Sequence, residues 1–356
     1  DVLYYLQAMF GYLHESEKRW YDTRDFCGAF RDCENLPLNP SVQMDVDEFL
    51  NMLFEKLEAG LGRTSSPKLL QSLFGGSVVN QIIDKAGRRL SERVEPFFVI
   101  SIEVKNKASV MDGLAQFVEG ETLDGDNKYN FEGEYVEATK RCCISRLPPV
   151  LILHLKRFEF DFDLMKKMKL YDHCEFPPSI DMAPYTVRYL ERQEKLLGEA
   201  EGPSPADEED GDCVYELAGV LVHTGTSDSG HYYSFIRERR AAQPGAHPWL
   251  HFNDTLVEPF DSSEIGKNCF GGVEPVVSWD VDTNKPVQRT QVKPHSAYML
   301  FYEKVSAHAQ SREGAPEAVP RGEGRDGARD QPMAEAEAGA EAEGGDSEAG
   351  ATAGAE

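Results

Sequence analysis

The sequence predicts an α+β protein, because helical hydrophobic spacing is concentrated in its first third and strand-like runs fill its second half. Apolar side chains recur at helical spacing in residues 1–20 and again in residues 43–61. A nearly continuous apolar run at 150–158 is typical of a central strand buried on both faces. With 356 residues and 40% hydrophobic content, the chain has room for one large domain or two ordinary ones.

The two N-terminal helices each present one apolar face. In the first helix that face consists of Leu3, Leu6, Met9, Phe10 and Leu13. In the second it consists of Val46, Phe49, Leu50, Leu53, Phe54 and Leu57, and Gly60 and Gly62 mark the end. Asp45 and Asp47 fall at the beginning of the second helix, where carboxylates suit the helix dipole.

Strands are predicted where branched and aromatic residues gather. The first two lie at 78–83 and 97–104, and a short helix at 110–118 follows them. The later strands are expected at 150–158, 215–222, 232–236, 250–252 and 297–301. The second half is therefore a sheet whose loops carry the polar residues.

Charge and cysteine content exclude several classes of partner and location. The net charge of −25 argues against nucleic acid, because phosphate binding requires a positive surface. No apolar run has the length of a membrane span, so we expect no membrane partner. Seven cysteines without a disulfide framework indicate a reducing compartment, the cytoplasm or the nucleus.

Much of the negative charge lies in two segments. Residues 190–213 carry nine acids against two bases, and residues 306–356 carry twelve against four. Neither segment has a hydrophobic period, so we expect 191–213 to be an acidic disordered insertion and 306–356 a disordered low-complexity tail. Residues 1–305 then form the folded domain.

Two polar motifs mark the ends of neighbouring predicted strands. His231 follows Gly230 at the start of one strand, and Asn253 and Asp254 follow another. A thiol nucleophile needs a histidine base, and the base needs a third group to hold its ring, so His231 and Asn253 form two thirds of a cysteine-protease triad. Taken singly, His231 could be structural and Asn253 a turn residue.

The nucleophile is not evident in this sequence. Neither Cys27 nor Cys33 lies in a small-residue turn leading into a helix, where N–H groups would favour the thiolate. We therefore expect the nucleophilic cysteine to lie outside this chain, before Asp1, and the fragment alone to be inactive.

The order of the motifs resembles that of a ubiquitin-specific protease catalytic domain, from the first helix to about Lys304. The matching motifs are QMDVDEF at 43–49, LPPVLILHLKRF at 147–158, GVLVH at 219–223, GHYY at 230–233 and FND at 252–254. Two further segments, 181–186 and 268–272, are most similar to the very large fat-facets-type members.

This resemblance implies a papain-like fold with fingers, palm and thumb, in which the N-terminal part of the thumb is missing. Residues 1–305 would be the catalytic domain, truncated at its front. The implied reaction is hydrolysis of the isopeptide or peptide bond after the C-terminal glycine of ubiquitin. His231 matches the general base and Asn253 the orienting residue, while Asp254 shares that task or polarises the oxyanion site.

The resemblance also implies five substrate-binding residues: Gln43, Asp45, Phe158, Gly230 and Tyr232. Asp45 would meet arginines of the ubiquitin tail, since a guanidinium prefers a carboxylate. Phe158 and Tyr232 match aromatic walls of a channel that admits only glycines. Asp45 could instead be only a helix-start residue, and either aromatic residue could be core.

One departure from the family concerns metal. Many relatives carry two Cys-x-x-Cys pairs that bind a structural zinc. Asp84 and Gly87 stand where the first pair would be, and the second would fall near Phe131 and Glu134. We expect no zinc, no other metal and no cofactor, and fingers held by strand pairing alone.

Two alternatives to an active deubiquitinase remain. The chain could be a catalytically inactive ubiquitin-binding domain, a pseudoenzyme that never had the thiol. The presence of both His231 and Asn253 favours a truncated enzyme, because a dead enzyme has no chemical reason to keep them. The other alternative is an unrelated β-rich scaffold with acidic segments.

Overall fold

The computed structural model describes residues 1–18, 20–31, 35–37, 39, 43–197, 213–239, 248–280 and 285–305. The predicted tail at 306–356 and residues 198–212 of the predicted insertion lie outside the described residues. The α-helices are α1 (Val2–Glu15), α2 (Arg24–Ala29), α3 (Val46–Leu61), α4 (Leu69–Phe74), α5 (Val110–Val118), α6 (Val187–Leu197) and α7 (Ile265–Cys269). Within the described residues the 3-10 helices are η1 (Gly125–Asn127), η2 (Ala183–Tyr185) and η3 (Ser262–Glu264).

The strands before residue 170 are β1 (Gly76–Asp84), β2 (Arg89–Phe97), β3 (Val99–Glu103), β4 (Glu121–Leu123), β5 (Tyr129–Phe131), β6 (Glu134–Val136), β7 (Ala138–Arg146), β8 (Val150–Lys156), β9 (Phe158–Asp161) and β10 (Lys166–Lys169). The later strands are β11 (Ser179–Asp181), β12 (Val214–Gly225), β13 (Gly230–Arg237), β14 (Trp249–Asn253), β15 (Leu256–Phe260), β16 (Val273–Asp280), β17 (Lys285–Val292) and β18 (His295–Lys304).

These strands form two larger sheets and three hairpins. The eight-stranded sheet has the order β15-β14-β13-β12-β18-β8-β3, with β11 added beside β12, and only its β3–β8 pair is parallel. The four-stranded sheet has the order β2-β1-β7-β4. The hairpins are β5–β6, β9–β10 and β16–β17.

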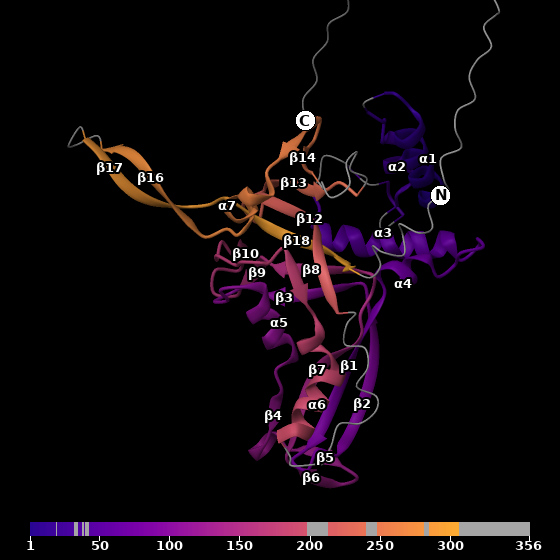
Figure 1. The fold of residues 1–356 in the computed structure, drawn as a ribbon, viewed down its shortest axis with the longest axis vertical. Coiled ribbons are helices and arrows are strands. Elements are labelled where there is room, and N and C mark those ends of the chain that lie inside the picture. Colours follow the sequence, from indigo (N-terminus) through magenta and orange to yellow (C-terminus); the bar gives the residue numbers. More distant parts are fainter. Residues whose placement is uncertain are drawn as a thin grey trace, which may run out of the picture. The chain divides into compact units, whose positions relative to one another are not determined.

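Strand β8 is central, as its apolar run predicted, and both of its faces are buried. Ile152 packs with the helical residues Phe54 and Leu57 on one face. Leu151 and Leu153 point into a second core that includes residues of α5. Figure 1 shows α3 and α4 on one side of β8 and α5 on the other. The sheet that carries His231 and Asn253 is therefore packed on both sides at its central strand.

Most predicted elements near the N-terminus are confirmed. α1 and α3 begin at caps, because the Asp1 and Asp45 side chains accept hydrogen bonds from the backbone N–H groups of Leu3 and Asp47. The helix predicted at 110–118 has those bounds, with a capping box between Ser109 and Asp112. The strand predicted at 97–104 is instead divided between β2 and β3.

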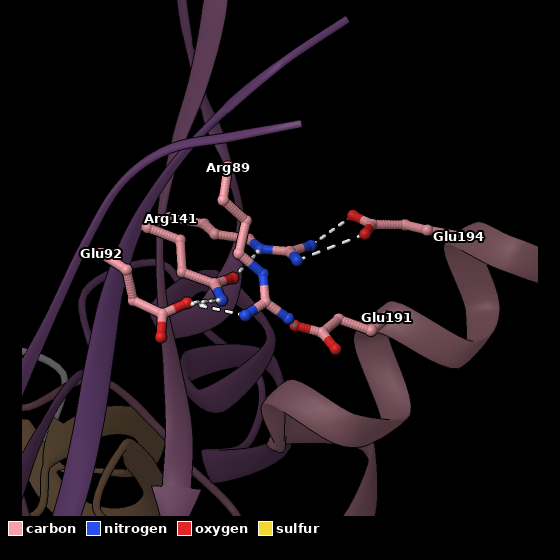
Figure 2. A network of polar contacts seen from close by, with 6 residues as sticks. Arg89, Glu92, Arg141, Glu191 and Glu194 are labelled. Carbon is pink, nitrogen blue, oxygen red and sulfur yellow. Dashed lines mark hydrogen bonds and ion pairs between the residues drawn. The ribbon is translucent and has the colours of Figure 1, made fainter. Parts of the chain in front are cut away.

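α6 is a correction to the predicted insertion, because residues 191–197 are helical. The helix lies against the four-stranded sheet, and ion pairs join them (Figure 2). Glu194 pairs with Arg141 of β7, and Glu191 pairs with Arg89 of β2. Two of the acidic residues that indicated disorder, Glu191 and Glu194, thus have basic partners on the sheet.

Within the described residues, none of the helices combines the length and the apolar character needed to cross a bilayer.

Candidate active site

His231 and Asn253 meet at the ends of two paired strands. β13 begins at Gly230 and β14 ends at Asn253, and their pairing places Ser234 opposite Phe252. The His231 Nε2 atom lies 2.7 Å from the Asn253 Oδ1 atom. The sequence predicted this partnership, and the antiparallel register is what brings the two side chains together.

This contact determines how the imidazole can exchange a proton. An amide oxygen can only accept a hydrogen bond, so Nε2 of His231 must carry the proton in the neutral ring. The lone pair is then on Nδ1, which is the nitrogen able to take a proton from a nucleophile. The His231 side chain is 41% exposed, so a substrate can reach it.

Asp254 lies beside this pair rather than within it. Its Oδ2 atom is 3.9 Å from His231 Nε2, and the carboxylate is 77% exposed. The residue has a φ of +51°, at the turn between β14 and β15. Asn253 therefore makes the shorter contact with the ring, and Asp254 contributes a solvated charge next to it.

Gly230 is packed so closely that no side chain fits. A Cβ atom there would lie 2.2 Å from His223 Nε2 and 2.4 Å from the Thr224 carbonyl oxygen. The Gly230 N–H donates a hydrogen bond to Gln43 Oε1 at 2.9 Å. This bond connects the start of the histidine strand to the segment that leads into α3.

Four rings gather beside this bond. The Phe158 ring centroid lies 5.1 Å from that of His223 and 5.5 Å from that of Tyr298. Tyr232 lies 4.8 Å from His223 and 5.7 Å from Tyr298. Tyr298 thus contacts both of the predicted aromatic residues, Phe158 and Tyr232. The sequence analysis did not identify Tyr298.

Asp45 makes several contacts at the start of α3. It caps α3, and its Oδ1 atom accepts a hydrogen bond from the Tyr298 hydroxyl at 2.5 Å. Burial, and secondarily the Asp45 carboxylate, raise the pKa of Tyr232 above its ordinary range. Asp45 also lines a narrow groove of about 90 Å³, formed by Gln43, Met44, Asp45, Phe158, Lys167, His223, Ser227, Asp228 and Tyr232.

A wider acidic cavity of about 470 Å³ shares Asp45 and Lys167 with the narrow groove. Its lining is Asp45, Asp47, Glu48, Asn51, Met52, Glu55, His154 and Lys167. Three carboxylates beyond Asp45 make it suitable for a cationic side chain. Sequence reasoning did not single out Glu48 or Glu55, although helical spacing from Asp45 puts them near one face.

Burial shifts the pKa of two further groups near the groove. Burial, followed by the nearby Lys169 charge, lowers the pKa of His223 to about 4, so this ring is neutral near pH 7. Burial also lowers the pKa of Lys169 to about 7. The Lys169 Nζ atom donates to the carbonyl oxygens of His223 and Pro294, at 2.9 and 2.7 Å. Lys169 therefore supports the strand end from which the loop toward His231 departs.

Most of the sequence matches the model of a known protein family. The family model described as "Ubiquitin carboxyl-terminal hydrolase" matches residues 1–302. The chain belongs to this ubiquitin carboxyl-terminal hydrolase family. This result confirms the resemblance given by the motif order and rules out an unrelated β-rich scaffold.

Several curated hydrolases are similar to this chain. Ubiquitin carboxyl-terminal hydrolase 34 of Homo sapiens is 36% identical over 314 residues, which cover 86% of this chain and 9% of the relative. Ubiquitin carboxyl-terminal hydrolase puf of Drosophila melanogaster is 35% identical, with 86% and 8% covered. The probable hydrolase FAF of the same organism is 34% identical, with 85% and 11% covered. The chain spans about a tenth of the relatives it matches, and the predicted likeness to fat-facets-type members is confirmed.

Solved structures show the same fold. A SAGA DUB module containing Ubp8 and bound to monoubiquitin has a TM-score of 0.52 and 24% identity, covering 74% of this chain and 48% of that chain. A second Ubp8-containing DUB module has a TM-score of 0.52 and 22% identity, with 74% and 51% covered. The predicted papain-like fold of the ubiquitin-specific proteases is therefore confirmed.

The described thiols of this hydrolase-family chain do not pair with His231. Among the described residues, the polar contacts of the imidazole are to Asn253 and Asp254. Burial raises the pKa of Cys143 and Cys174 to about 11 and that of Cys269 to about 12, which disfavours the thiolate. Cys27 lies on α2, which packs on α1, and Cys33 lies outside the described residues.

The residues at the zinc positions of other family members do not fit a sulfur-ligated metal. Asp84 Oδ1 accepts hydrogen bonds from the backbone N–H groups of Ala86 and Arg88, at 3.0 and 2.8 Å, so it stabilises the β1–β2 turn. Gly87 has a φ of +79°, which suits glycine. The Arg88 guanidinium lies 5.3 Å from the Phe131 ring centroid and connects this turn to the β5–β6 hairpin. The contact between Arg88 and Phe131 thus joins the β1–β2 hairpin to the β5–β6 hairpin, in addition to the strand pairing that the sequence predicted.

Proposed function

We propose that this chain is the main part of a deubiquitinase that cleaves the isopeptide or peptide bond after the C-terminal glycine of ubiquitin. In this proposal residues 1–305 act as the catalytic domain, and the nucleophilic cysteine lies outside these 356 residues. The single observation that supports it best is the 2.7 Å contact between His231 Nε2 and Asn253 Oδ1 beside a narrow groove.

In the first half of the reaction, Nδ1 of His231 takes the thiol proton, and the thiolate attacks the glycine carbonyl carbon. Asn253 accepts the Nε2 hydrogen bond and keeps the ring turned toward the nucleophile. The imidazolium then gives its proton to the leaving amine, the carbon–nitrogen bond breaks, and a thioester remains. Asp254 places an exposed carboxylate beside the ring during this step.

In the second half, the neutral His231 removes a proton from water, and the resulting hydroxide attacks the thioester carbonyl. The leaving thiolate takes the proton back from the His231 imidazolium, and the ubiquitin carboxylic acid is released and loses its proton to solvent. No cofactor or metal takes part in this proposed sequence. In each half of the reaction, His231 accepts one proton and later donates it.

The groove and the acidic cavity suit different parts of a ubiquitin tail. A space of about 90 Å³ between Phe158 and Tyr232 accommodates residues without side chains, such as glycine. The adjoining cavity of about 470 Å³, with Asp45 and Glu48, accommodates arginine side chains. Gln43, which lines the narrow groove, accepts the hydrogen bond of the Gly230 N–H. The proposed partners are therefore ubiquitin and ubiquitinated proteins, in the cytoplasm or nucleus, without nucleic acid or membrane.

A second candidate is an inactive ubiquitin-binding domain, which the lack of a described thiol beside His231 favours. The transcript sequence upstream of Asp1 distinguishes the two. We expect an open reading frame with a cysteine shortly before a helix. A start codon close to Asp1 without such a cysteine would leave binding as the function.

The protein translated from that longer transcript gives the catalytic test. We expect His231→Ala to abolish hydrolysis of a fluorogenic ubiquitin amide while ubiquitin affinity is retained. Tyr135→Ala, an exposed change on β6, is the control and should leave turnover near the wild-type value. Turnover that survives in the His231 variant would remove the base from this mechanism.

A further inference from the structure

Tyr298 lies at an irregular point of strand β18. On the neighbouring strand β12, Leu221 is opposite Met299, and the next residue, Val222, is opposite Ala297. Tyr298 lies between Ala297 and Met299, so on β12 it has no residue opposite it. An extra residue of this kind forms a β-bulge, and bulges beside functional sites redirect side chains. The position of Tyr298 therefore points to a role beyond strand pairing.

The bulge determines the direction of the Tyr298 side chain. Successive side chains of a regular strand point to opposite faces of the sheet. In β18, however, Tyr298 and Met299 both belong to the core that includes residues of α3. Ala297 and Leu300, on either side, belong to the core that includes residues of α5. The extra residue thus turns Tyr298 toward α3, which begins just after Asp45.

The Tyr298 ring contacts residues that line both the narrow groove and the acidic cavity. Its centroid lies 5.5 Å from that of Phe158 and 5.7 Å from that of Tyr232, which line the groove. It lies 4.8 Å from the centroid of His154, which lines the cavity. Tyr298 itself is 1% exposed and lines neither of them. It can therefore act on a bound molecule only through the residues that it contacts.

The hydrogen bonds of the Asp45 side chain are concentrated on one of its two carboxylate oxygens. Oδ1 accepts the Tyr298 hydroxyl at 2.5 Å and the Asp47 backbone N–H at 3.0 Å. These two bonds use both lone pairs of Oδ1. Oδ2 accepts no hydrogen bond from the residues that the structure describes. Oδ2 is consequently the oxygen that remains available to a ligand.

The Tyr298 hydroxyl is a hydrogen-bond donor near neutral pH. Burial raises the pKa of Tyr298 above its ordinary range, and the hydrogen bond to Asp45 raises this pKa further. The hydroxyl therefore keeps its proton and donates a hydrogen bond to the carboxylate. Hydrogen bonds from a hydroxyl to an ionised oxygen are shorter and stronger than those between neutral groups. The bond thus fixes the orientation of the Asp45 carboxylate.

We propose that Tyr298 is a positioning residue for substrate binding, whose hydroxyl holds the Asp45 carboxylate in the orientation that presents Oδ2 to a guanidinium of the substrate. A group that is already fixed loses little conformational freedom when a ligand binds, so the ligand is bound more tightly. Without the hydroxyl, the Asp47 N–H alone would restrain the carboxylate. This inference rests on the proposed binding of the ubiquitin tail, and it adds a residue that does not touch the substrate.

The test is isothermal titration of the 356-residue chain with ubiquitin. We expect about fivefold weaker binding by Tyr298→Phe, which keeps the ring and removes only the hydroxyl. Tyr302→Phe is the matched control. Tyr302 also lies on β18, is fully buried in the core that includes residues of α5, and donates from its hydroxyl to the Pro177 carbonyl oxygen at 2.7 Å. Its variant should lose a similar amount of stability in urea unfolding and bind ubiquitin as the wild type does.

Two further variants separate positioning from a general effect on the fold. We expect the combined Asp45→Asn and Tyr298→Phe variant to bind no more weakly than Asp45→Asn alone, because the hydroxyl acts through the carboxylate. Para-aminophenylalanine at position 298 keeps a hydrogen-bond donor and should restore most of the affinity. Losses that multiply in the combined variant, or equal losses for Tyr298→Phe and Tyr302→Phe, would overturn the proposal.

A second probe distinguishes failure of this inference from failure of the proposed function. The probe is a fluorescein-labelled peptide of alternating arginine and glycine, followed by fluorescence anisotropy, and we expect Tyr298→Phe to bind it more weakly than the wild type does. Ubiquitin binding that Tyr298→Phe leaves unchanged would overturn the inference and leave the proposed function standing. Peptide binding that depends on Tyr298, without any binding of ubiquitin, would contradict the proposed function and support the inference. Binding of neither probe by the wild type would overturn both.

Discussion

The eight-stranded and four-stranded sheets of this protein are stabilised in different ways. In the eight-stranded sheet, which carries His231 and Asn253, the central strand β8 has fully buried leucines at 151, 153 and 155. In the four-stranded sheet, α6 is joined to the strands by charged side chains. Arg141 donates to Gln81 and pairs with Glu194, while Arg89 pairs with Glu92 and Glu191 (Figure 2).

This difference has consequences for how each region responds to solution conditions. Burial of apolar area is insensitive to moderate salt, whereas exposed ion pairs are screened by it. At salt concentrations that weaken the attachment of α6, the eight-stranded sheet should therefore keep its geometry. The comparison suggests that the chain keeps its proposed catalytic groups on the part whose stability depends least on charge.

The largest expected effect is on the eight-stranded core. Leu153→Ala removes a side chain that is 0% exposed between β3 and β18, and we expect a loss of about 2–5 kcal/mol in the free energy of unfolding. Urea unfolding followed by circular dichroism measures this loss. Val94→Ala on the exposed face of β2 should cost less than about 0.5 kcal/mol. Similar losses for the two variants would contradict the assigned core.

An intermediate effect is expected at Arg141. This side chain is 7% exposed and donates from Nε to the buried Gln81 Oε1 at 3.0 Å, so Arg141→Met leaves that oxygen without its donor. We expect a loss of about 1–3 kcal/mol, again from urea unfolding. Arg89→Met is the control, since its side chain is 51% exposed and its ion pairs should contribute less than about 1 kcal/mol. An equal loss in the free energy of unfolding for Arg89→Met would mean that burial does not determine how much each arginine stabilises the protein.

A pH effect is expected at Lys169, which lies on β10 and donates to the His223 carbonyl of the eight-stranded sheet. The pKa of Lys169 falls from its ordinary 10.5 to about 7 in the folded protein, because the amine is buried. Between these values the unfolded chain binds a proton that the folded chain does not, so stability rises with pH and the gain is lost as pH falls toward 7. Lys169→Met should remove this rise, measured as the difference between the two proteins in thermal unfolding from pH 7 to 10. A variant with the same slope as the wild type would contradict the lowered pKa.

The elements that the sequence predicted are those whose signals are local. α5 has a capping box and β8 a continuous apolar run, and both were found close to their observed bounds. His231 and Asn253 were found because they sit in recognisable motifs at strand ends. The break between β2 and β3 was missed, since residues 97–104 have no polar residue at the turn that separates them.

The elements that were missed depend on contacts made only in three dimensions. The glutamates of α6 resemble a solvated acidic segment until Arg89 and Arg141 are placed beside them. β16 and β17 contain Pro275 and Pro286, which weaken a strand prediction although proline is tolerated at sheet edges. Tyr298 holds the Asp45 carboxylate across 253 positions of sequence, a pairing that no local pattern contains.

Ubiquitin binding by the Asp45→Asn variant tests the central claim most directly, because Asn keeps the helix cap and removes only the charge shared by the groove and the acidic cavity. Isothermal titration of the 356-residue chain with ubiquitin provides the affinity at low and high salt. We predict roughly tenfold weaker binding and a smaller salt dependence than in the wild type. Asp25→Asn, an exposed acid on α2, should bind as the wild type does. An affinity unchanged by Asp45→Asn, or no binding by the wild type, would contradict the account of this site.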